Sequence, residues 1–342
     1  MRLTDTVLVT GISGFVGGHV ALSLLQAGYR VRGSVRSLKR ADAVRATLAA
    51  AGAETERLEF VALDLLDDRG WSDAVRGCRY LQHVASPFIL GEPKDRMDLI
   101  RPAVDGTRRA LEAGLAAGVE RIVLTSSIAA VMYGHPGSRT SPFTAADWSL
   151  TEGGDVTAYT ESKTRAELEA WSVMEAAGRR GDLVAINPTA IFGPLLDEDP
   201  GTSALLVKRL LDGSIPAAPR FSLGIVDIRD VAELHLHAMT TPDAGGRRFP
   251  ASPETLWMIE IADILRTAFP ERAGRIPRFR VPDMLVRIAA LFDRDARANL
   301  AGLGIRRGVD SRDAEVLLGR PFISPRLALT ATARSLIEKG LV

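Results

Sequence analysis

The sequence predicts an α/β protein in which a doubly wound parallel sheet is joined to a smaller, mostly helical C-terminal lobe. Two observations lead to this prediction. Short β-branched runs alternate with longer helix-like runs up to about residue 190, as they do in chains built from βαβ units with right-handed crossovers. The length of 342 residues also suits one large α/β unit with a smaller companion.

The first element is a strand at residues 7–10, and three glycines follow it at Gly11, Gly14 and Gly17. In a strand, turn and helix of this order, the first glycine allows the tight turn and the second lets the backbone approach a pyrophosphate. The third lets helix and strand pack closely. The pyrophosphate would lie against the N-terminus of the helix-like stretch at 19–27, where free N–H groups favour an anion. The spacing is G-x-x-G-x-x-G, and a glycine-rich turn that binds no ligand is the alternative.

The second strand, at 29–36, ends at the position that decides between NAD and NADP. In an NAD site an Asp or Glu about 20 residues after the glycine turn binds the ribose 2′-hydroxyl. The sequence has no acid between Gly28 and Arg40; it has Arg36 at this point, with Lys39 and Arg40 behind it. A guanidinium matches a doubly charged 2′-phosphate, so the sequence predicts NADP(H) as the cofactor. A solvated basic turn is the alternative.

The next three strands are expected at 58–63, 81–85 and 121–127. A helix from near Pro102, a residue that suits a first helical turn, to Gly118 would join the last two. The fifth strand ends in hydroxyl residues, Thr125 to Ser127. Ligands bind outside the carboxyl ends of the strands in an open parallel sheet, so Ser127 lies where it could contact a substrate. Hydroxyls that merely satisfy a strand end are the alternative.

The helix expected at 159–177 carries Tyr159 and Lys163, which share one helix face at i and i+4. Tyrosine has a reference pKa of about 10. A cation about 4 Å away, at an effective dielectric of about 20, favours the phenolate by about 4 kcal/mol, or roughly three pKa units. The sequence therefore predicts that Lys163 acidifies Tyr159 into a general acid for hydride transfer, with Ser127 on the carbonyl oxygen. An exposed Tyr and Lys pair without a role is the alternative.

A sixth strand is expected at 182–188, and the pattern changes after it. The linker at 195–201 is acidic and rich in turn residues, and the helices that follow it are separated by irregular segments. The predicted division is an NADP-binding Rossmann domain at 1–190, to which 218–242 returns, and a substrate-binding lobe made of 191–217 and 243–342.

The composition argues against several classes of partner. Lys plus Arg is 43 and Asp plus Glu is 42, and the net charge of +1 gives no reason to expect nucleic acid or an anionic membrane. The single cysteine, Cys78, excludes an internal disulfide and fits a reducing compartment. No stretch has the form of a signal peptide, and no uncharged run approaches the ~18 residues of a membrane span. We expect a cytoplasmic monomer or homodimer with a small-molecule substrate and no metal site.

Several phrases of the sequence together resemble the extended short-chain dehydrogenase/reductases. They are Thr10-Gly-Ile-Ser-Gly-Phe-Val-Gly17, Val84-Ala-Ser-Pro-Phe88, Val104-Asp-Gly-Thr107, Val123-Leu-Thr-Ser-Ser127, Tyr159-Thr-Glu-Ser-Lys163 and Asn187-Pro188. The phrases Ser86-Pro-Phe88, Ile100-Arg-Pro-Ala-Val104 and Phe143-Thr-Ala-Ala-Asp-Trp148 are most similar to the dihydroflavonol-reductase group, and within it to the aldehyde or methylglyoxal reductase type. The resemblance runs through about residue 230 and is loose beyond residue 250.

The resemblance implies roles for individual residues. It implies that Ser127, Tyr159 and Lys163 form the catalytic set. Besides the glycines, the implied cofactor contacts are Phe15 and Val16 at the pyrophosphate, Arg36 and Arg40 at the 2′-phosphate, Asp64 and Leu65 beside the adenine, and Ala85 and Pro188 beside the ribose and nicotinamide. The implied substrate pocket is lined by Phe88, Ile128, Met132, Val156, Thr157 and Ala190. Relatives carry larger aromatic groups at the positions of Met132 and Ala190, which implies a wider pocket here.

Residues and resemblance together predict an NADPH-dependent carbonyl reductase. It would reduce an aldehyde or ketone to an alcohol by hydride transfer, with Tyr159 as the general acid. A hydroxysteroid dehydrogenase, or another oxidoreductase of the extended group, is the enzymatic alternative. The alternative from a different class is a sensor that binds NADP without turnover, although such sensors usually lack the Tyr and Lys pair.

Overall fold

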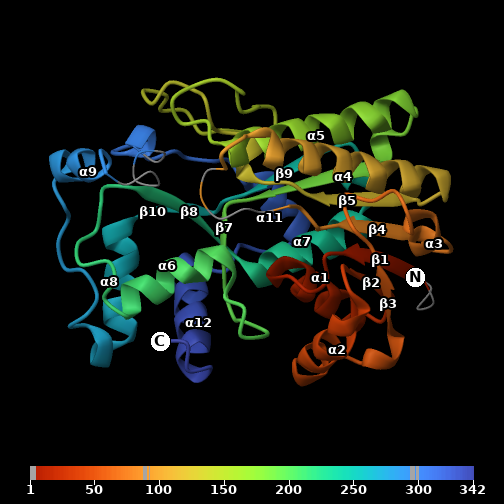
Figure 1. Ribbon diagram of the computed structural model, residues 1–342, viewed down its shortest axis with the longest axis horizontal. Helices are drawn as coiled ribbons and strands as arrows, with labels where there is room; N and C mark the ends of the chain where they lie inside the picture. Colours follow the sequence, from red (N-terminus) through yellow and green to blue (C-terminus); the bar gives the residue numbers. More distant parts are fainter. Residues whose placement is uncertain (1–4, 88–90, 92, 293–296, 298–299) are drawn as a thin grey trace.

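The chain folds around a seven-stranded sheet with the strand order β3-β2-β1-β4-β5-β6-β9 (Figure 1). The computed structural model describes residues 5–87, 91, 93–292, 297 and 300–342. Every neighbouring pair in this sheet is parallel. The strands are β1 (Thr6–Thr10), β2 (Arg30–Val35), β3 (Leu58–Ala62), β4 (Tyr80–His83), β5 (Arg121–Thr125), β6 (Leu183–Pro188) and β9 (Arg248–Ala251). The order reverses between β1 and β4, which is where an open α/β sheet forms its ligand crevice.

Helices cover both faces of this sheet, so its central strands β1, β4, β5 and β6 are almost entirely buried. The helices are α1 (Phe15–Gln26), α2 (Ala41–Ala50), α3 (Trp71–Val75), α4 (Met97–Ala116), α5 (Ala158–Ala176), α6 (Gly201–Leu211), α7 (Ile228–Thr240), α8 (Met258–Ala268), α9 (Asp283–Ala289), α11 (Arg312–Leu318) and α12 (Pro325–Glu338). In Figure 1, α4 and α5 lie above the sheet and α1 and α7 below it. Every residue of β6 is buried, as expected for a strand with both faces covered. This arrangement confirms the predicted fold class.

Each face of the sheet has its own apolar core. Leu24 of α1, Leu234 of α7 and Leu317 of α11 belong to one core. Trp71 of α3 and Leu111 of α4 belong to the core on the opposite face, together with α5. These two cores fix α1 and α5, the helices that follow the glycine turn and carry Tyr159, on opposite sides of the crevice.

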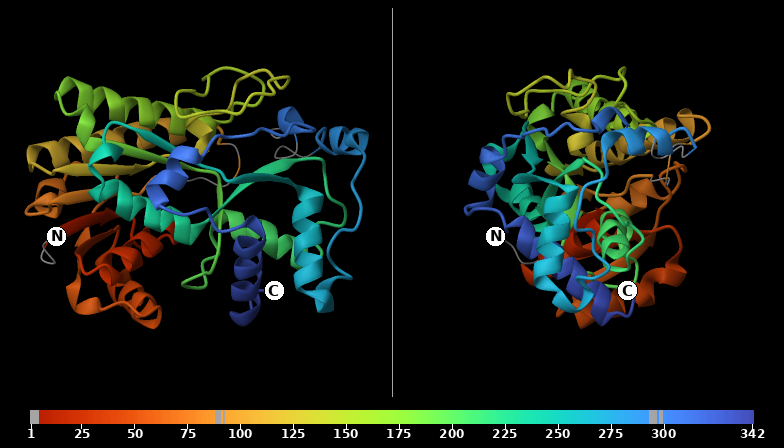
Figure 2. Two further views of the ribbon diagram at one scale, coloured as in Figure 1. Left: turned by 180° about the vertical axis from the view of Figure 1, so that it is seen from behind. Right: turned by 90° about the vertical axis from the view of Figure 1, so that its left-hand side faces the viewer.

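The second lobe is built on a small sheet with the order β10-β8-β7. Its strands are β7 (Ala190–Phe192), β8 (Ser222–Asp227) and β10 (Glu254–Trp257). Leu210 of α6, Leu265 of α8 and Leu336 of α12 share one core with this sheet. Figures 1 and 2 show the lobe at the end of the molecule away from the N-terminus. The lobe therefore lies beside the carboxyl ends of β5 and β6.

The strands do not follow the domain boundaries expected from the sequence, and the division into domains stays a prediction. Strand β8 falls in 218–242, which was expected to return to the main domain, but it pairs within the small sheet. Strand β9 falls in 243–342, which was expected in the lobe, but it pairs with β6 at the edge of the main sheet. The chain thus crosses between the two sheets more often than the division predicted from the linker at 195–201 would allow.

Two helices begin earlier than the sequence suggests. Helix α1 begins at Phe15, directly after the glycine turn. Helix α4 begins at Met97, and Pro102, expected near its start, lies inside it. The fixed φ of proline fits a helix, and the residue removes one N–H donor to the carbonyl of Asp98 without ending the helix here. None of the helices within the described residues has the length and apolar character needed to cross a bilayer.

Candidate active site

The glycine turn brings the end of β1 against the start of α1. Gly11 has a φ of 69°, a left-handed conformation that glycine adopts without strain. The N–H of Gly14 donates to the carbonyl of Gly11 at 3.0 Å. A Cβ atom on Gly17 would lie 2.2 Å from the same carbonyl oxygen, so no larger residue fits at this position. The turn thus presents the first N–H groups of α1, beginning at Phe15, to the crevice.

A single cleft joins this turn to the predicted catalytic residues. Its volume is about 1880 Å³, beyond the roughly 300–1,000 Å³ of a pocket for one small molecule, so a dinucleotide and a substrate could both fit. The residues expected at the cofactor or substrate that line it are Gly11, Gly14, Phe15, Val16, Gly17, Arg36, Arg40, Asp64, Leu65, Ala85, Ile128, Met132, Thr157 and Ala190. Lys163, Val156 and Pro188 are not among the residues that line the cleft, and Phe88 lies outside the described residues.

Two arginines stand at the end of the cleft that follows β2. Both Arg36 and Arg40 are exposed and line the cleft. Within the part of the chain that the structure describes, neither guanidinium has a hydrogen-bond or ion-pair partner. Ser34, which no sequence motif marks, accepts the N–H of Gly11 on its Oγ at 3.2 Å and thereby connects β2 to the glycine turn. The arginines and the glycine turn therefore lie at the same edge of the sheet.

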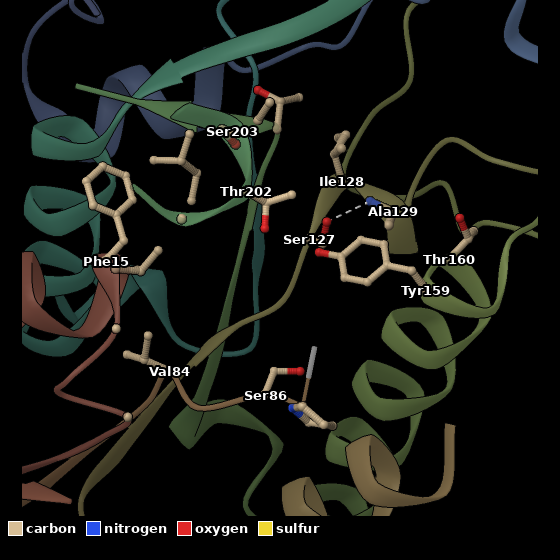
Figure 3. Close-up of a pocket in the computed structure, with 18 of the residues that line it drawn as sticks. Phe15, Val84, Ser86, Ser127, Ile128, Ala129, Tyr159, Thr160, Thr202 and Ser203 are labelled. Atoms are coloured by element: carbon tan, nitrogen blue, oxygen red, sulfur yellow. Dashed lines mark hydrogen bonds between the residues drawn. The ribbon is translucent and has the colours of Figure 1, made fainter. Parts of the chain in front are cut away.

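Ser127 lies just beyond the carboxyl end of β5, as expected. It caps the short helical turn Ile128–Ala130, and its Oγ accepts the N–H of Ala129 at 3.1 Å. Its side chain is buried at the wall of the cleft, with 8% of the residue exposed. Figure 3 shows the Ser127 and Tyr159 hydroxyls pointing toward one another. Oγ accepts the Ala129 N–H through one lone pair, so the Ser127 hydroxyl can still donate its own proton to an acceptor.

Tyr159 lies in the first turn of α5. The helix starts after Thr157, whose Oγ1 accepts the N–H of Thr160 at 3.1 Å, so this expected pocket residue also serves as the helix N-cap. Lys163 follows one turn later, and its Nζ is 6.0 Å from the centroid of the Tyr159 ring. Phe15 of α1 and Thr202 and Ser203 of α6 face Tyr159 across the cavity (Figure 3).

The pKa of Tyr159 differs from the expectation that Lys163 would lower it. Burial raises the pKa of the Tyr159 hydroxyl, and the hydrogen bond to Ser127 acts in the opposite direction. The reason is that the buried site disfavours the phenolate more than its neighbours favour it. The pKa of Lys163 is lowered to about 8, mainly by burial, while Glu167 opposes that change. Tyr159 therefore holds its proton at neutral pH, the state that a general acid requires.

Among the described residues, no group of three or more His, Cys, Asp or Glu side chains is placed to hold a metal ion. His83 donates to or accepts from Thr10 at 3.0 Å, and burial lowers its pKa to about 3. His235 contacts Thr125 at 3.0 Å and is held neutral in the same way. Both histidines are buried: His83 connects β4 to β1, and His235 connects α7 to β5.

Comparison with known proteins identifies the family of the chain. The model of the NAD dependent epimerase/dehydratase family matches residues 7–250. The chain belongs to this family. The match confirms the resemblance to the extended short-chain dehydrogenase/reductases that the motifs suggested.

Members of the family with known names are similar over most of the chain. The ketoreductase azaE of Aspergillus niger is 31% identical over 323 residues, which cover 89% of this chain and 94% of the relative. Cinnamoyl-CoA reductase 1 of Petunia hybrida is 35% identical over 272 residues, covering 78% of each chain. The crystal structure of yeast methylglyoxal/isovaleraldehyde reductase Gre2 complexed with NADPH has a TM-score of 0.80 and 26% identity, covering 98% of this chain and 100% of that one.

The sequence did not predict which residues form the wall of the cleft on the side of the lobe. It is formed by Arg209, Ile215, Phe221, Met258, Ile305 and Arg307. Arg307 forms an ion pair with Asp155 at 2.5 Å, and its guanidinium lies 5.4 Å from the ring of Tyr133. These contacts join the loop before α5 to the C-terminal segment. No motif marks the lobe residues, because α6 and the small sheet bring them together from distant parts of the chain. The roles of the predicted site residues stay predictions.

Proposed function

We propose that this protein is an NADPH-dependent carbonyl reductase that reduces an aldehyde or a ketone to an alcohol. The observation that carries the proposal is the facing pair of hydroxyls, Ser127 and Tyr159 (Figure 3). They lie in the cleft that is also lined by the glycine turn and the two exposed arginines. Similarity to a ketoreductase and to a reductase complexed with NADPH supports it.

The residues of the cleft suit NADPH. The glycine turn leaves no room for a Cβ at Gly17 and presents the N-terminus of α1, which fits a pyrophosphate. Arg36 and Arg40 would bind the 2′-phosphate, since no acid stands at this turn to bind a free 2′-hydroxyl. Lys163 would hold the ribose hydroxyls. When bound, the nicotinamide supplies the hydride that reduces the carbonyl carbon.

The chain's own residues would act on the carbonyl oxygen. Ser127 donates its hydroxyl proton in a hydrogen bond to this oxygen, because its Oγ already accepts from Ala129. Tyr159 transfers its proton to the oxygen as the negative charge develops there. The phenolate that remains is stabilised by the ammonium of Lys163, one helical turn away. Ser127 and Lys163 are buried, and Tyr159 is partly exposed to the cleft, so a bound substrate would exclude water from the site and strengthen each of these interactions.

A ketone of steroid size is the second candidate substrate. Met132 and Ala190 line the cleft and leave it wider than aromatic residues would. The lobe side adds an apolar wall that includes Phe221, Met258 and Ile305. A bulky, mostly apolar ketone would contact both walls, and this favours including ketosteroids among the substrates tested. The cytoplasmic location and the monomeric or dimeric state stay predictions from the sequence.

Substitution of Tyr159 by phenylalanine tests the proposed role directly. Tyr159→Phe removes the transferable proton and is expected to lower kcat by about 10²–10⁴, with the NADPH dissociation constant and the melting temperature near those of the parent. Tyr29→Phe, which removes a buried phenol of the sheet core, is the matched control and should keep full activity. Near-parental turnover by a folded Tyr159→Phe enzyme would rule out this residue as the acid.

A further inference from the structure

A carboxylate is buried behind the catalytic residues. Glu167 lies on α5, one turn beyond Lys163 and two turns beyond Tyr159, and its side chain is 0% exposed. Four side chains donate hydrogen bonds to it: Ser126 Oγ at 2.5 Å and Asn187 Nδ2 at 2.6 Å to Oε2, and Arg248 Nε at 2.6 Å and Trp171 Nε1 at 3.2 Å to Oε1. A buried carboxylate is tolerated when it is paired and its lone pairs are satisfied, as they are here.

Arg248 is the charged partner of Glu167 and comes from the edge strand β9. Its guanidinium stacks on the Trp148 ring, 3.7 Å from the centroid. Its Nη1 donates to the carbonyls of Ala145 and Asp147 at 2.9 and 2.6 Å. Its Nη2 donates to the carbonyl of Ala130 at 3.1 Å. Arg248 therefore links Glu167 to the short helical turn that follows Ser127.

The network holds the segment that carries Ser127 at three points. The Ser126 hydroxyl is bound by Glu167, the Ser127 carbonyl accepts Asn187 Nδ2 at 3.2 Å, and the Ala130 carbonyl accepts Arg248. Asn187 and Arg248 are themselves held by the same carboxylate. Removal of the carboxylate would free all three contacts at once. A misplacement of about 1 Å in a reacting group costs on the order of 10²-fold in rate, so the three contacts that fix the position of Ser127 affect catalysis.

Glu167 also acts on the charge of Lys163. The two residues are at i and i+4 on α5, and Glu167 raises the pKa of Lys163 against the effect of burial. Tyr159 faces Lys163 from the same helix, and His83 faces it from β4. His83 is neutral at pH 7 because burial lowers its pKa to about 3. Glu167 is therefore the negative charge that favours the ammonium form of Lys163.

We propose that Glu167, held by Arg248, is a positioning residue for the reduction: it fixes residues 126–130 so that Ser127 faces Tyr159, and it places a negative charge one helical turn from Lys163. The inference rests on the proposed carbonyl reductase activity. It assigns a role in the reaction to a buried ion pair that does not touch the substrate.

The chain offers a matched control on the same helix. Glu169 lies two residues further along α5, and its carboxylate pairs with Arg108 of α4 at 2.7 Å. Its side chain is 24% exposed, and its ion pair lies between α4 and α5, away from the cleft. Glu169→Gln therefore removes the same charge and the same kind of ion pair without reaching Ser127 or Lys163.

The test compares Glu167→Gln, Glu169→Gln and Ser126→Ala in NADPH oxidation with an active carbonyl substrate. We expect Glu167→Gln to lower kcat at least about tenfold and to move the alkaline limb of the pH profile about one unit lower. The NADPH dissociation constant, measured by fluorescence titration, should change less than kcat. Ser126→Ala removes one contact but no charge, so it should lower kcat several-fold and leave the alkaline limb in place. Glu169→Gln should match the parent.

Each other outcome counts against the inference. A Glu167→Gln protein that melts at a lower temperature but has the parental kcat and pH profile would make the ion pair purely structural. If Glu167→Gln does not fold, Ser126→Ala decides, and a parental kcat for that variant would overturn the positioning role. If the parent protein does not oxidise NADPH with any of the carbonyls tested, the proposed function is refuted, and the role of Glu167 in the reaction is refuted with it.

Discussion

The choice between NADPH and NADH should depend on Arg36. Arg36→Ala removes an exposed guanidinium from the end of the cleft beyond β2. A hydrogen bond between charged groups contributes about 1.5–3 kcal/mol, and solvent screening at this exposed site favours the lower value. A loss of about 1.4 kcal/mol raises the NADPH dissociation constant roughly tenfold. NADH has no 2′-phosphate, so its dissociation constant should stay the same.

Fluorescence titration of both cofactors measures this difference. Arg30→Ala is the matched control, because Arg30 is an exposed arginine at the opposite end of the same strand. At about 3.3 Å per residue it lies roughly 20 Å from Arg36, beyond the Debye length of about 8 Å at physiological salt. It should therefore leave both affinities unchanged. If Arg36→Ala weakened the binding of NADPH and NADH equally, or weakened neither, the 2′-phosphate would not be recognised at this turn.

Two further predictions concern stability. Gly17→Ala places a Cβ 2.2 Å from the Gly11 carbonyl oxygen, so the turn must shift, and we expect the free energy of unfolding to fall by about 1–3 kcal/mol together with NADPH affinity. Gly181→Ala, which meets no atom within 4 Å, is the control in the same urea titration, and equal stability of the two variants would contradict the account. Lys163→Met should abolish turnover yet raise the free energy of unfolding at pH 7 by up to about 3 kcal/mol, since burial lowers the lysine pKa from 10.5 to about 8. Below pH 8 the buried ammonium of Lys163 destabilises the folded parent, and this destabilisation disappears between pH 8 and 10.5. The difference in free energy of unfolding between Lys163→Met and the parent should therefore shrink over that range. A difference that does not change with pH would contradict this prediction.

Sequence reasoning located the parts of the site whose chemistry is local. The turn through Gly11 and Gly17 could be predicted because a strand, a close backbone approach and a helix start follow one another within a few residues. Tyr159 and Lys163 could be placed on one helix face by their spacing. Ser127 could be assigned to the carboxyl end of its strand because a parallel sheet has its ligand side there.

The sequence could not supply what depends on burial or on distant contacts. The pKa of Tyr159 was expected to fall, but a spacing of four residues says nothing about desolvation, which raises it. Glu167 and Arg248 lie on a helix and an edge strand far apart in the chain, and nothing in their local sequence marks them as partners. Glu167 and Arg248 come together because β9 pairs with β6. The linker at 195–201 did not suggest this pairing.

The most direct test of the central claim is NADPH oxidation by the parent protein, followed by absorbance across aldehydes, diketones, keto esters and ketosteroids, with NADH in parallel. We predict turnover with at least one carbonyl class and a clear preference for NADPH over NADH. Binding of NADPH without its oxidation by any of these carbonyls would contradict the claim that the protein is a carbonyl reductase.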